Sequence, residues 1–474
     1  MTGTSRRDSG ASPEAPAYAA KRLWPGAPEL VVIAPSGGGR GLAVARPHCK
    51  ASGGGPGRAV ARVGCAASEG GRHPNPDPRS YALRTLGTAI GVLTLASAAI
   101  AQPPAFVSPE IGPDRTITLR YFAPAAKQVT VNGELDGKPH TLTRGADGVW
   151  STTVGPLAAD IYTYAFNVDG VTALDPRNAN TKLGYGMFGA VSVVQVPGDG
   201  PQFYDAKPVP HGEVRIRPYE SKSLGLSRTV WVYTPPGYDA GKDYPVLYLL
   251  HGAGDVESGW VLIGRANLIL DNLIAEKRAR PMVVVMPLGH TIQSFWTGPA
   301  KSVPDQLSRL TGRGSLDAVL TAMMSGDEKD GLSPFGRDLT ADVMPLIERT
   351  YKVSKKADDR AVVGLSMGGG HSINLAFARP ELFRYVGLLS PAATGQIDQL
   401  YPKTFSNVDA LNKQFKLLWL GVGKDDTLTG PGDKALHEAF TRLGVTHKFE
   451  LTDGRHEWTV WRHHLNELAP LLFR

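Results

Sequence analysis

The sequence predicts two folded parts, a small all-β sandwich and a larger α/β domain built around a mostly parallel sheet. Two observations support this fold class. Short alternating strands separated by Asp-Gly turns occupy residues 104–197, a spacing typical of an all-β sandwich. Unbroken apolar runs alternate with helical patterns in residues 214–474, as expected where strands are buried on both faces of a sheet.

The composition excludes several classes of protein. Of the 474 residues, 42% are hydrophobic and 20% are charged, so a sizeable core can form and global disorder is excluded. The formal net charge is +7, but residues 1–101 hold 12 Lys and Arg against 5 Asp and Glu and account for all of it. The remaining chain is neutral, which argues against a nucleic-acid partner. Both cysteines, Cys49 and Cys65, precede residue 102, so the later chain has no cysteine nucleophile or cysteine-ligated zinc.

The N-terminal 101 residues contain two predicted segments. Residues 1–80 are rich in Gly, Pro, Ala and Arg, which predicts a disordered leader or a start codon assigned too far upstream. Residues 81–101 hold a short apolar run, preceded by arginine, that ends in Ala99-Ile100-Ala101. This pattern is typical of a secretory signal peptide. We therefore expect cleavage after Ala101, a secreted or periplasmic protein, and no membrane contact once the signal is removed.

Residues 102–197 form the predicted β-sandwich module. Apolar residues alternate at Ile117, Leu119 and Tyr121, and again over 162–168. The stretch from Asp147-Gly148-Val149-Trp150 to Asp175-Pro176 resembles early-set domains, immunoglobulin-like modules related to carbohydrate-binding modules. The resemblance implies that residues 104–197 could bind a glycan. Trp150 and the tyrosines would then stack on sugar rings, and the alternative is that they pack in the core of the module. A proline-rich linker, residues 198–213, follows the module.

The α/β domain is predicted over residues 214–474. Strands are expected at 245–250, 281–286, 361–364, 416–422 and 447–451, and helices at 266–276, 339–349, 369–378 and 434–443. In sheets of this kind, ligands bind where strands end and helices begin. The candidate functional residues should therefore lie on the loops that follow the strands.

A nucleophile motif stands at the first of these positions. Gly364-Leu365-Ser366-Met367-Gly368 follows a predicted strand and precedes a predicted helix. This is the G-x-S-x-G elbow in the strand–turn–helix context that gives the motif its meaning. The sharp turn exposes the serine hydroxyl, and the helix N-terminus beneath it favours developing negative charge. Ser366 is the predicted nucleophile of an α/β-hydrolase fold.

A serine nucleophile needs a base and a carboxylate, which follow it in the order Ser, Asp or Glu, His in this fold. Asp425 and Asp426 both follow the strand at 416–422, and either is a candidate acid. His456 follows the next strand and is the predicted base. His463 and His464 fall within the last helix, and position 460 is Val460, so the H-E-x-x-H zinc motif is incomplete. We expect no metal and no cofactor.

The remaining predicted feature is an oxyanion hole. His251-Gly252-Ala253-Gly254 ends a buried strand upstream of the elbow. Small residues at that place in the chain let a backbone N–H approach a substrate carbonyl. The predicted donors are the N–H groups of Ala253 and Met367.

These motifs together resemble carbohydrate esterase family one, the esterase D-like group, and within it the bacterial feruloyl esterases. The resemblance spans nearly all of residues 214–474 and aligns the acid with Asp426 and the base with His456. A departure is an inserted segment at 299–333, which suggests a lid over the site.

The resemblance implies a serine esterase acting on an ester-bearing small molecule or polysaccharide, with feruloyl groups on plant polysaccharide as the leading substrate. An acetyl-xylan esterase, a siderophore-type esterase and an acyltransferase are alternatives in the same class. From a different class, the alternative is a glycan-binding protein whose hydrolase domain is a non-catalytic scaffold.

Overall fold

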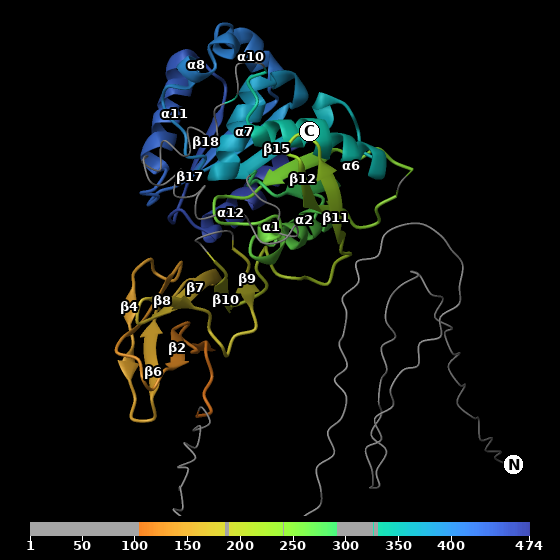
Figure 1. Ribbon diagram of the computed structural model, residues 1–474. Helices are drawn as coiled ribbons and strands as arrows, with labels where there is room; N and C mark the ends of the chain where they lie inside the picture. Colours follow the sequence, from red (N-terminus) through yellow and green to blue (C-terminus); the bar gives the residue numbers. More distant parts are fainter. Residues whose placement is uncertain (1–103, 185–188, 240, 292–325, 327–329) are drawn as a thin grey trace, which may run out of the picture. The chain divides into compact units, whose positions relative to one another are not determined.

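The computed structural model describes residues 104–184, 189–239, 241–291, 326 and 330–474 (Figure 1). The chain divides into two units, Met1–Leu95 and Ala96–Arg474, and the described residues all belong to the second. The predicted leader, the signal peptide and most of the segment 299–333 lie outside the described residues. Within the described part of the chain, no helix is both long and apolar enough to cross a membrane.

The first described region consists of two antiparallel sheets. One has the strand order β1-β2-β6-β5, and the other has the order β4-β3-β7-β10-β9, with β8 paired to β7. The strands are β1 (Glu110–Ile111), β2 (Ile117–Phe122), β3 (Val129–Gly133), β4 (His140–Thr141), β5 (Thr143–Arg144), β6 (Val149–Val154), β7 (Asp160–Val168), β8 (Val171–Ala173), β9 (Thr181–Lys182) and β10 (Val191–Val196).

The two sheets share one apolar core. Ile117 and Leu119 from β2 and Phe166 from β7 are fully buried in it. Because side chains alternate between the two faces of a strand, the polar neighbours of these residues face outward. Trp150 is 7% exposed, and its indole N–H donates to the carbonyl of Ala123 at 2.8 Å. Trp150 is therefore packed in the core, and the alternative of a sugar-stacking platform at this residue is wrong.

The second described region contains an eight-stranded sheet with the order β11-β12-β14-β13-β15-β16-β17-β18. β12 pairs antiparallel with both β11 and β14, and the remaining pairs, from β14 to β18, are parallel. The strands are β11 (Glu213–Ser221), β12 (Leu226–Thr234), β13 (Val246–Leu250), β14 (Val283–Pro287), β15 (Arg360–Leu365), β16 (Tyr385–Leu389), β17 (Leu417–Gly423) and β18 (Lys448–Thr452). The predicted mostly parallel sheet is confirmed.

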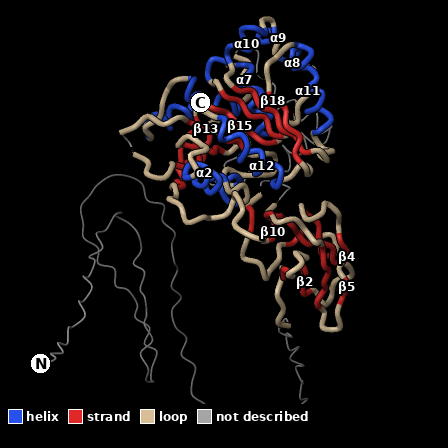
Figure 2. The backbone as a smooth tube through the Cα atoms, turned by 180° about the vertical axis from the view of Figure 1, so that it is seen from behind, coloured by secondary structure: helices blue, strands red, loops and turns tan. Residues whose placement is uncertain are grey.

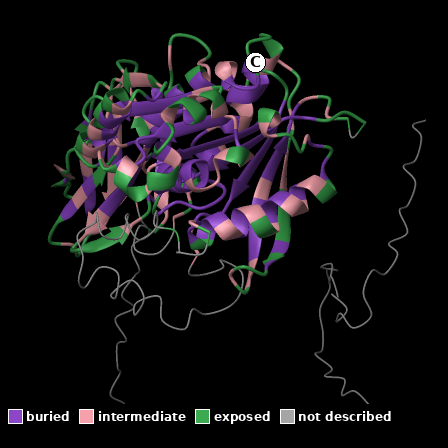
Figure 3. Cartoon of the chain, turned by 90° about the horizontal axis from the view of Figure 1, so that it is seen from above, coloured by how far each residue is buried: buried purple, intermediate pink, exposed green. Residues whose placement is uncertain are grey.

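Helices cover both faces of this sheet, as seen from behind in Figure 2 and from above in Figure 3. Within β13, Tyr248 and Leu250 join one apolar core, while Leu247 and Leu249 join the other. This alternation explains why the strand has no polar residue. The helical segments are α1 (Gly259–Leu262), α2 (Ala266–Ala275), α5 (Pro334–Arg337), η2 (Asp338–Val343), α6 (Met344–Thr350), η3 (Ala357–Asp359), α7 (Met367–Ala378), η4 (Pro380–Leu382), α8 (Ile397–Leu400), α9 (Pro402–Phe405), α10 (Val408–Gln414), α11 (Gly430–Leu443), α12 (Trp458–Leu468) and η5 (Ala469–Leu471).

Two predicted segments differ from the structure. The helix expected at 339–349 is a π-helical segment, η2, followed by α6. Pro345 has no N–H for the carbonyl four residues earlier, so regular α-helical bonding cannot run through this segment. The predicted linker 198–213 has no helix or strand until β11 begins at Glu213, and it packs against the α/β domain. Tyr204 is 1% exposed, and the side-chain amide of Asn272 donates to the carbonyls of Phe203 and Asp205, both at 2.9 Å.

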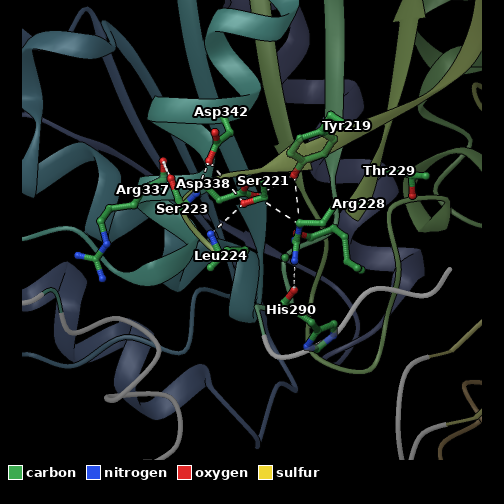
Figure 4. Close-up of polar contacts among 12 residues, drawn as sticks. Tyr219, Ser221, Ser223, Leu224, Arg228, Thr229, His290, Arg337, Asp338 and Asp342 are labelled. Atoms are coloured by element: carbon green, nitrogen blue, oxygen red, sulfur yellow. Dashed lines mark hydrogen bonds and ion pairs between the residues drawn. The ribbon is translucent and has the colours of Figure 1, made fainter. Parts of the chain in front are cut away.

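A buried ion pair joins the antiparallel edge of the sheet to η2 (Figure 4). The guanidinium of Arg228 on β12 lies 3.4 Å from the carboxylate of Asp338, and both side chains are fully buried. Tyr219 donates to Asp338 at 2.8 Å, and Arg228 also donates to the backbone carbonyls of Leu288 and His290, which follow β14. Burial raises the pKa of Asp338 against the charge of Arg228. Through Arg228, this cluster connects His290 with Asp338, the residues on either side of 291–337.

We expect Arg228→Leu to lower the free energy of unfolding by about 3–5 kcal/mol, because it leaves the Asp338 charge buried without its partner. The double variant Arg228→Leu/Asp338→Leu should recover a large part of this loss. Arg215→Leu is the matched control, since Arg215 pairs with Glu213 at the exposed surface and should cost about 0–1 kcal/mol. Equilibrium urea unfolding measures all three, and an Arg228 variant as stable as the Arg215 variant would contradict the assignment.

Candidate active site

The predicted nucleophile lies at a strained turn between β15 and α7. Ser366 has φ 50° and ψ −119°, a conformation outside the regions that side chains ordinarily allow. A Cβ added to Gly368 would lie 2.6 Å from the carbonyl oxygen of His251, so only glycine leaves room for the turn. The first N–H groups of α7 follow Ser366 directly, and the positive end of this helix lies at the hydroxyl.

The two other predicted catalytic residues meet the nucleophile from separate loops. His456 follows β18, and Asp426 follows β17. The Nε2 atom of His456 lies 2.9 Å from Ser366 Oγ, and its Nδ1 atom lies 2.8 Å from Asp426 Oδ2. The structure thus brings Ser366, His456 and Asp426 into one hydrogen-bonded chain. Their order along the sequence is Ser, Asp, His, as the elbow motif requires.

The adjacent carboxylates have different environments. Asp426 is 4% exposed, whereas Asp425 is exposed and its backbone N–H donates to the carbonyl of Gly454. Burial acts to raise the pKa of Asp426, but hydrogen bonds and the charge of His456 and bonds from Thr429 outweigh it, so the pKa lies well below its usual range. Asp426 is therefore ionised at neutral pH and can orient the imidazole.

Sequence reasoning missed Thr429. Its N–H donates to Asp426 Oδ1 and its hydroxyl donates to Asp426 Oδ2, both at 2.9 Å. The N–H of Leu428 also donates to Asp426 Oδ1, at 3.0 Å. These three bonds hold the carboxylate in one orientation toward His456. The spacing Asp-x-x-Thr was the available signal, because a short acidic side chain often accepts N–H groups two and three residues later.

The predicted oxyanion donors lie on two elements that touch at the nucleophile. A Cβ on Gly252 would be 3.2 Å from Ser366 Cβ, so the loop after β13 packs directly on the elbow. Ala253 is the exposed residue of this loop, and Met367 is the first residue of α7. The arrangement leaves the Ala253 and Met367 N–H groups as the candidate donors to a carbonyl oxygen near Ser366 Oγ.

His251 has a structural role beside this loop. Its Nδ1–H donates to the carbonyl of Gly252 at 2.9 Å, and its Nε2 accepts the N–H of Gly289 at 2.8 Å. Burial, with a contribution from nearby His290, places the pKa of His251 well below its usual value, so the ring is neutral. Among the described residues, no group of three or more His, Cys, Asp or Glu side chains has an arrangement that could hold a metal ion.

The other histidines near the C-terminus lie away from this chain of contacts. His447 bonds to His437 at 2.8 Å, and buried His464 bonds to the Thr452 hydroxyl at 3.0 Å. His463 stands on the same helix with its ring against Phe203. His456 is the histidine that contacts Ser366. In this arrangement the Ser366 hydroxyl can act as a nucleophile, with His456 as the base and Asp426 as the carboxylate that orients it.

Comparisons with known proteins agree with this chemistry. The sequence model of the family described as "Putative esterase" matches residues 221–472. A protein of Xylanibacter ruminicola named endo-1,4-beta-xylanase/feruloyl esterase is 29% identical over 375 residues, which cover 77% of this chain and 46% of that protein. The chain therefore spans about half the length of this relative. The predicted resemblance to feruloyl esterases of this family is confirmed.

Two solved esterase structures are similar to this chain. An enterochelin esterase from Shigella flexneri matches with a TM-score of 0.55 and 17% identity, covering 76% of this chain and 93% of that one. A ferulic acid esterase from the anaerobic fungus Anaeromyces mucronatus matches with a TM-score of 0.44 and 23% identity, covering 58% and 96%. The match to the enterochelin esterase covers three quarters of this chain, whereas the family model matches residues 221–472, about half of it. It agrees with an α/β-hydrolase-like fold.

Proposed function

Since the chain belongs to the "Putative esterase" family, we propose that it is a serine esterase that releases feruloyl or related acyl groups from plant polysaccharide. The family and its esterase relatives support a carboxylic ester hydrolase. The observation that carries the proposal is the chain of contacts from Ser366 through His456 to Asp426, with 2.9 Å and 2.8 Å between the bonded atoms.

The proposed reaction has two steps. Ser366 Oγ attacks the ester carbonyl carbon while His456 Nε2 takes the hydroxyl proton, and the N–H groups of Ala253 and Met367 stabilise the oxyanion. The C–O bond to the alcohol breaks as His456 returns the proton to the leaving oxygen, which leaves an acyl-Ser366. Water then gives a proton to His456 and attacks the acyl carbon. The C–O bond to Ser366 breaks as His456 returns the proton to Oγ, and the acid is released. Asp426 stabilises the imidazolium in both steps. An alcohol in place of water would make the enzyme an acyltransferase.

The feruloyl substrate is supported by the relative from Xylanibacter ruminicola, which is named as a xylanase and feruloyl esterase. Acetyl-xylan esterase and siderophore-type esterase are the competing activities, and enterochelin esterase is a fold neighbour. The intact nucleophile, base and acid argue against a purely glycan-binding scaffold. The apolar run at 81–101 supports a secreted or periplasmic protein.

For the N-terminal module, we propose an immunoglobulin-like early-set domain with a glycan contact. Its two antiparallel sheets around one core support that fold. The module also has a pocket of about 420 Å³ on the sheet that contains β3 and β7. The pocket is lined by Asn132, Gly133, Gly137, Lys138, Pro139, Thr163, Tyr164, Ala165 and Val191. Since Trp150 is buried, this pocket is the better candidate for a glycan.

The experiment is a substrate comparison with the purified protein. Methyl ferulate, methyl acetate, acetylated xylan, a catecholate trilactone and p-nitrophenyl acetate would be compared by kcat/KM. With methanol as the common leaving group, we expect kcat/KM for methyl ferulate to exceed that for methyl acetate, because an aromatic acyl group has apolar area to bury that an acetyl group lacks. Preference for acetylated xylan or for the trilactone would replace the feruloyl assignment, and no turnover of any ester would refute the esterase.

A further inference from the structure

The β-sandwich module contacts both loops that carry the candidate catalytic groups. Its contacts reach the segment around His456, at the start of α12, and the loop after β13 that carries Ala253. Figure 1 shows β9 and β10 on the side of the module that faces α12 and α1. The two regions also share one apolar cluster, to which Ile161 and Val193 of the module contribute.

Glu134, which follows β3, binds the chain on both sides of His456. Its carboxylate accepts the N–H of Thr163 within the module at 3.0 Å and the N–H of Trp458 at 2.9 Å. Its backbone carbonyl accepts a bond from Arg455 Nη2 at 2.9 Å. Arg455 directly precedes His456, and Trp458 follows it by two residues. One module residue therefore holds both ends of the four-residue segment that presents the catalytic base.

The bond to Trp458 also caps a helix. Trp458 is the first residue of α12, and Glu457, at the N-cap, makes no side-chain capping bond. The first N–H groups of a helix lack intrahelical partners, and a negative charge is favourable there. Glu134 supplies the missing acceptor from the module, while burial raises the pKa of its carboxyl. One turn further on, buried Arg462 pairs with Asp160 of β7 at 2.6 Å, which fixes the same helix to the module a second time.

Lys182 of β9 makes the contact with the other loop. Its ammonium lies 2.7 Å from the carboxylate of Asp255, and both side chains are largely buried. Asp255 follows Ala253 by two residues, and its N–H donates to the carbonyl of Gly252. The ring of Trp458 lies beside the same loop, since a Cβ added to Gly259 would be 3.0 Å from Asp255 Oδ1 and 3.4 Å from a carbon of the Trp458 ring. Glu134 therefore holds the loop after β18 and Lys182 holds the loop after β13, and both residues belong to the module.

We infer that Glu134 and Lys182 are positioning residues for the esterase reaction: through Trp458, Arg455 and Asp255 they set the places of the base and of an oxyanion donor relative to Ser366. This inference rests on the function proposed above. The distance between His456 and Ser366 depends on where these two loops lie, and a displacement of 1 Å costs about a hundredfold in rate. The module is thus part of the catalytic unit as well as a candidate glycan-binding domain.

The test uses Glu134→Ala and Lys182→Met in the full chain, with kcat expressed per active site titrated by a serine-directed phosphonate. We expect each to lower kcat by about 10- to 100-fold while KM for a small ester changes little, because the substrate contacts remain. Glu134→Gln, which keeps an acceptor oxygen for Trp458, and Lys182→Arg, which keeps the charge, should recover most of the activity. The matched control is Glu110→Ala, since Glu110 pairs with Arg120 inside the module at an exposed position.

The inference would be overturned if Glu134→Ala and Lys182→Met both had the same kcat as the Glu110→Ala control. Rate losses that disappear once the rates are corrected for the folded fraction at the assay temperature would overturn it as well. If Glu134→Ala does not fold, Lys182→Met and its Arg rescue decide the question. Failure of the proposed function is distinguishable, because the parent protein itself would then neither hydrolyse an ester nor take up the phosphonate at Ser366.

Discussion

Ser366→Ala is expected to remove nearly all ester hydrolysis while the fold stays intact. The hydroxyl of Ser366 is the atom that forms the acyl-enzyme, and loss of a triad nucleophile costs on the order of a million-fold in kcat. Alanine removes only the Oγ atom that bonds to His456, so the strained turn and its contacts with Gly252 and Gly368 remain. The measurement is kcat on methyl ferulate beside the melting temperature of each variant.

A serine elsewhere on the surface provides the control for this substitution. Ser406 is exposed, and its hydroxyl bonds to the carbonyl of Lys403, so Ser406→Ala should retain the parent kcat. A serine-directed phosphonate should label the parent protein at Ser366 and leave the Ser366→Ala variant unlabelled. Labelling at a different serine, with Ser366→Ala still active, would show that another residue is the nucleophile.

Asp426→Asn is expected to lower kcat by about ten-thousand-fold, the loss known for this change in a serine protease triad. Asparagine keeps the shape of the side chain, and its amide can still lie among the Leu428 and Thr429 donors. It removes the negative charge that stabilises the imidazolium of His456. An amide N–H turned toward Nδ1 would also select the wrong tautomer of the ring.

The neighbouring carboxylate is the matched control for the acid. Asp425→Asn changes the same functional group one residue earlier, but the Asp425 side chain is exposed, and its backbone N–H donates to the carbonyl of Gly454. We expect a nearly normal kcat on the same ester at pH 7, and a melting temperature like that of the parent. An inactive Asp425→Asn beside a nearly normal Asp426→Asn would reverse the assignment of the acid.

The sequence by itself predicted the parallel sheet, the elbow at Ser366 and the loops that carry the acid and the base. These features depend on local patterns. Apolar runs define the buried strands, small residues define the sharp turn, and the order of the strands determines which loops meet at one edge of the sheet. The base followed from the same reasoning, because His456 is the histidine that comes directly after the last strand.

The local pattern left Asp425 and Asp426 both open, and the family resemblance favoured Asp426. The tertiary structure shows which of them reaches His456, because the direction of a side chain on a loop depends on contacts that no local pattern encodes. Burial among the donors of Thr429 and Leu428 turns Asp426 inward and leaves Asp425 in solvent. The role of Glu134 likewise could not be predicted from the sequence, since its partner Trp458 lies 324 residues away along the chain. A carboxyl group in a turn has no local signature of a helix cap, and it is the packing of the module on α12 that brings its oxygen to the N–H of Trp458 beside the catalytic base.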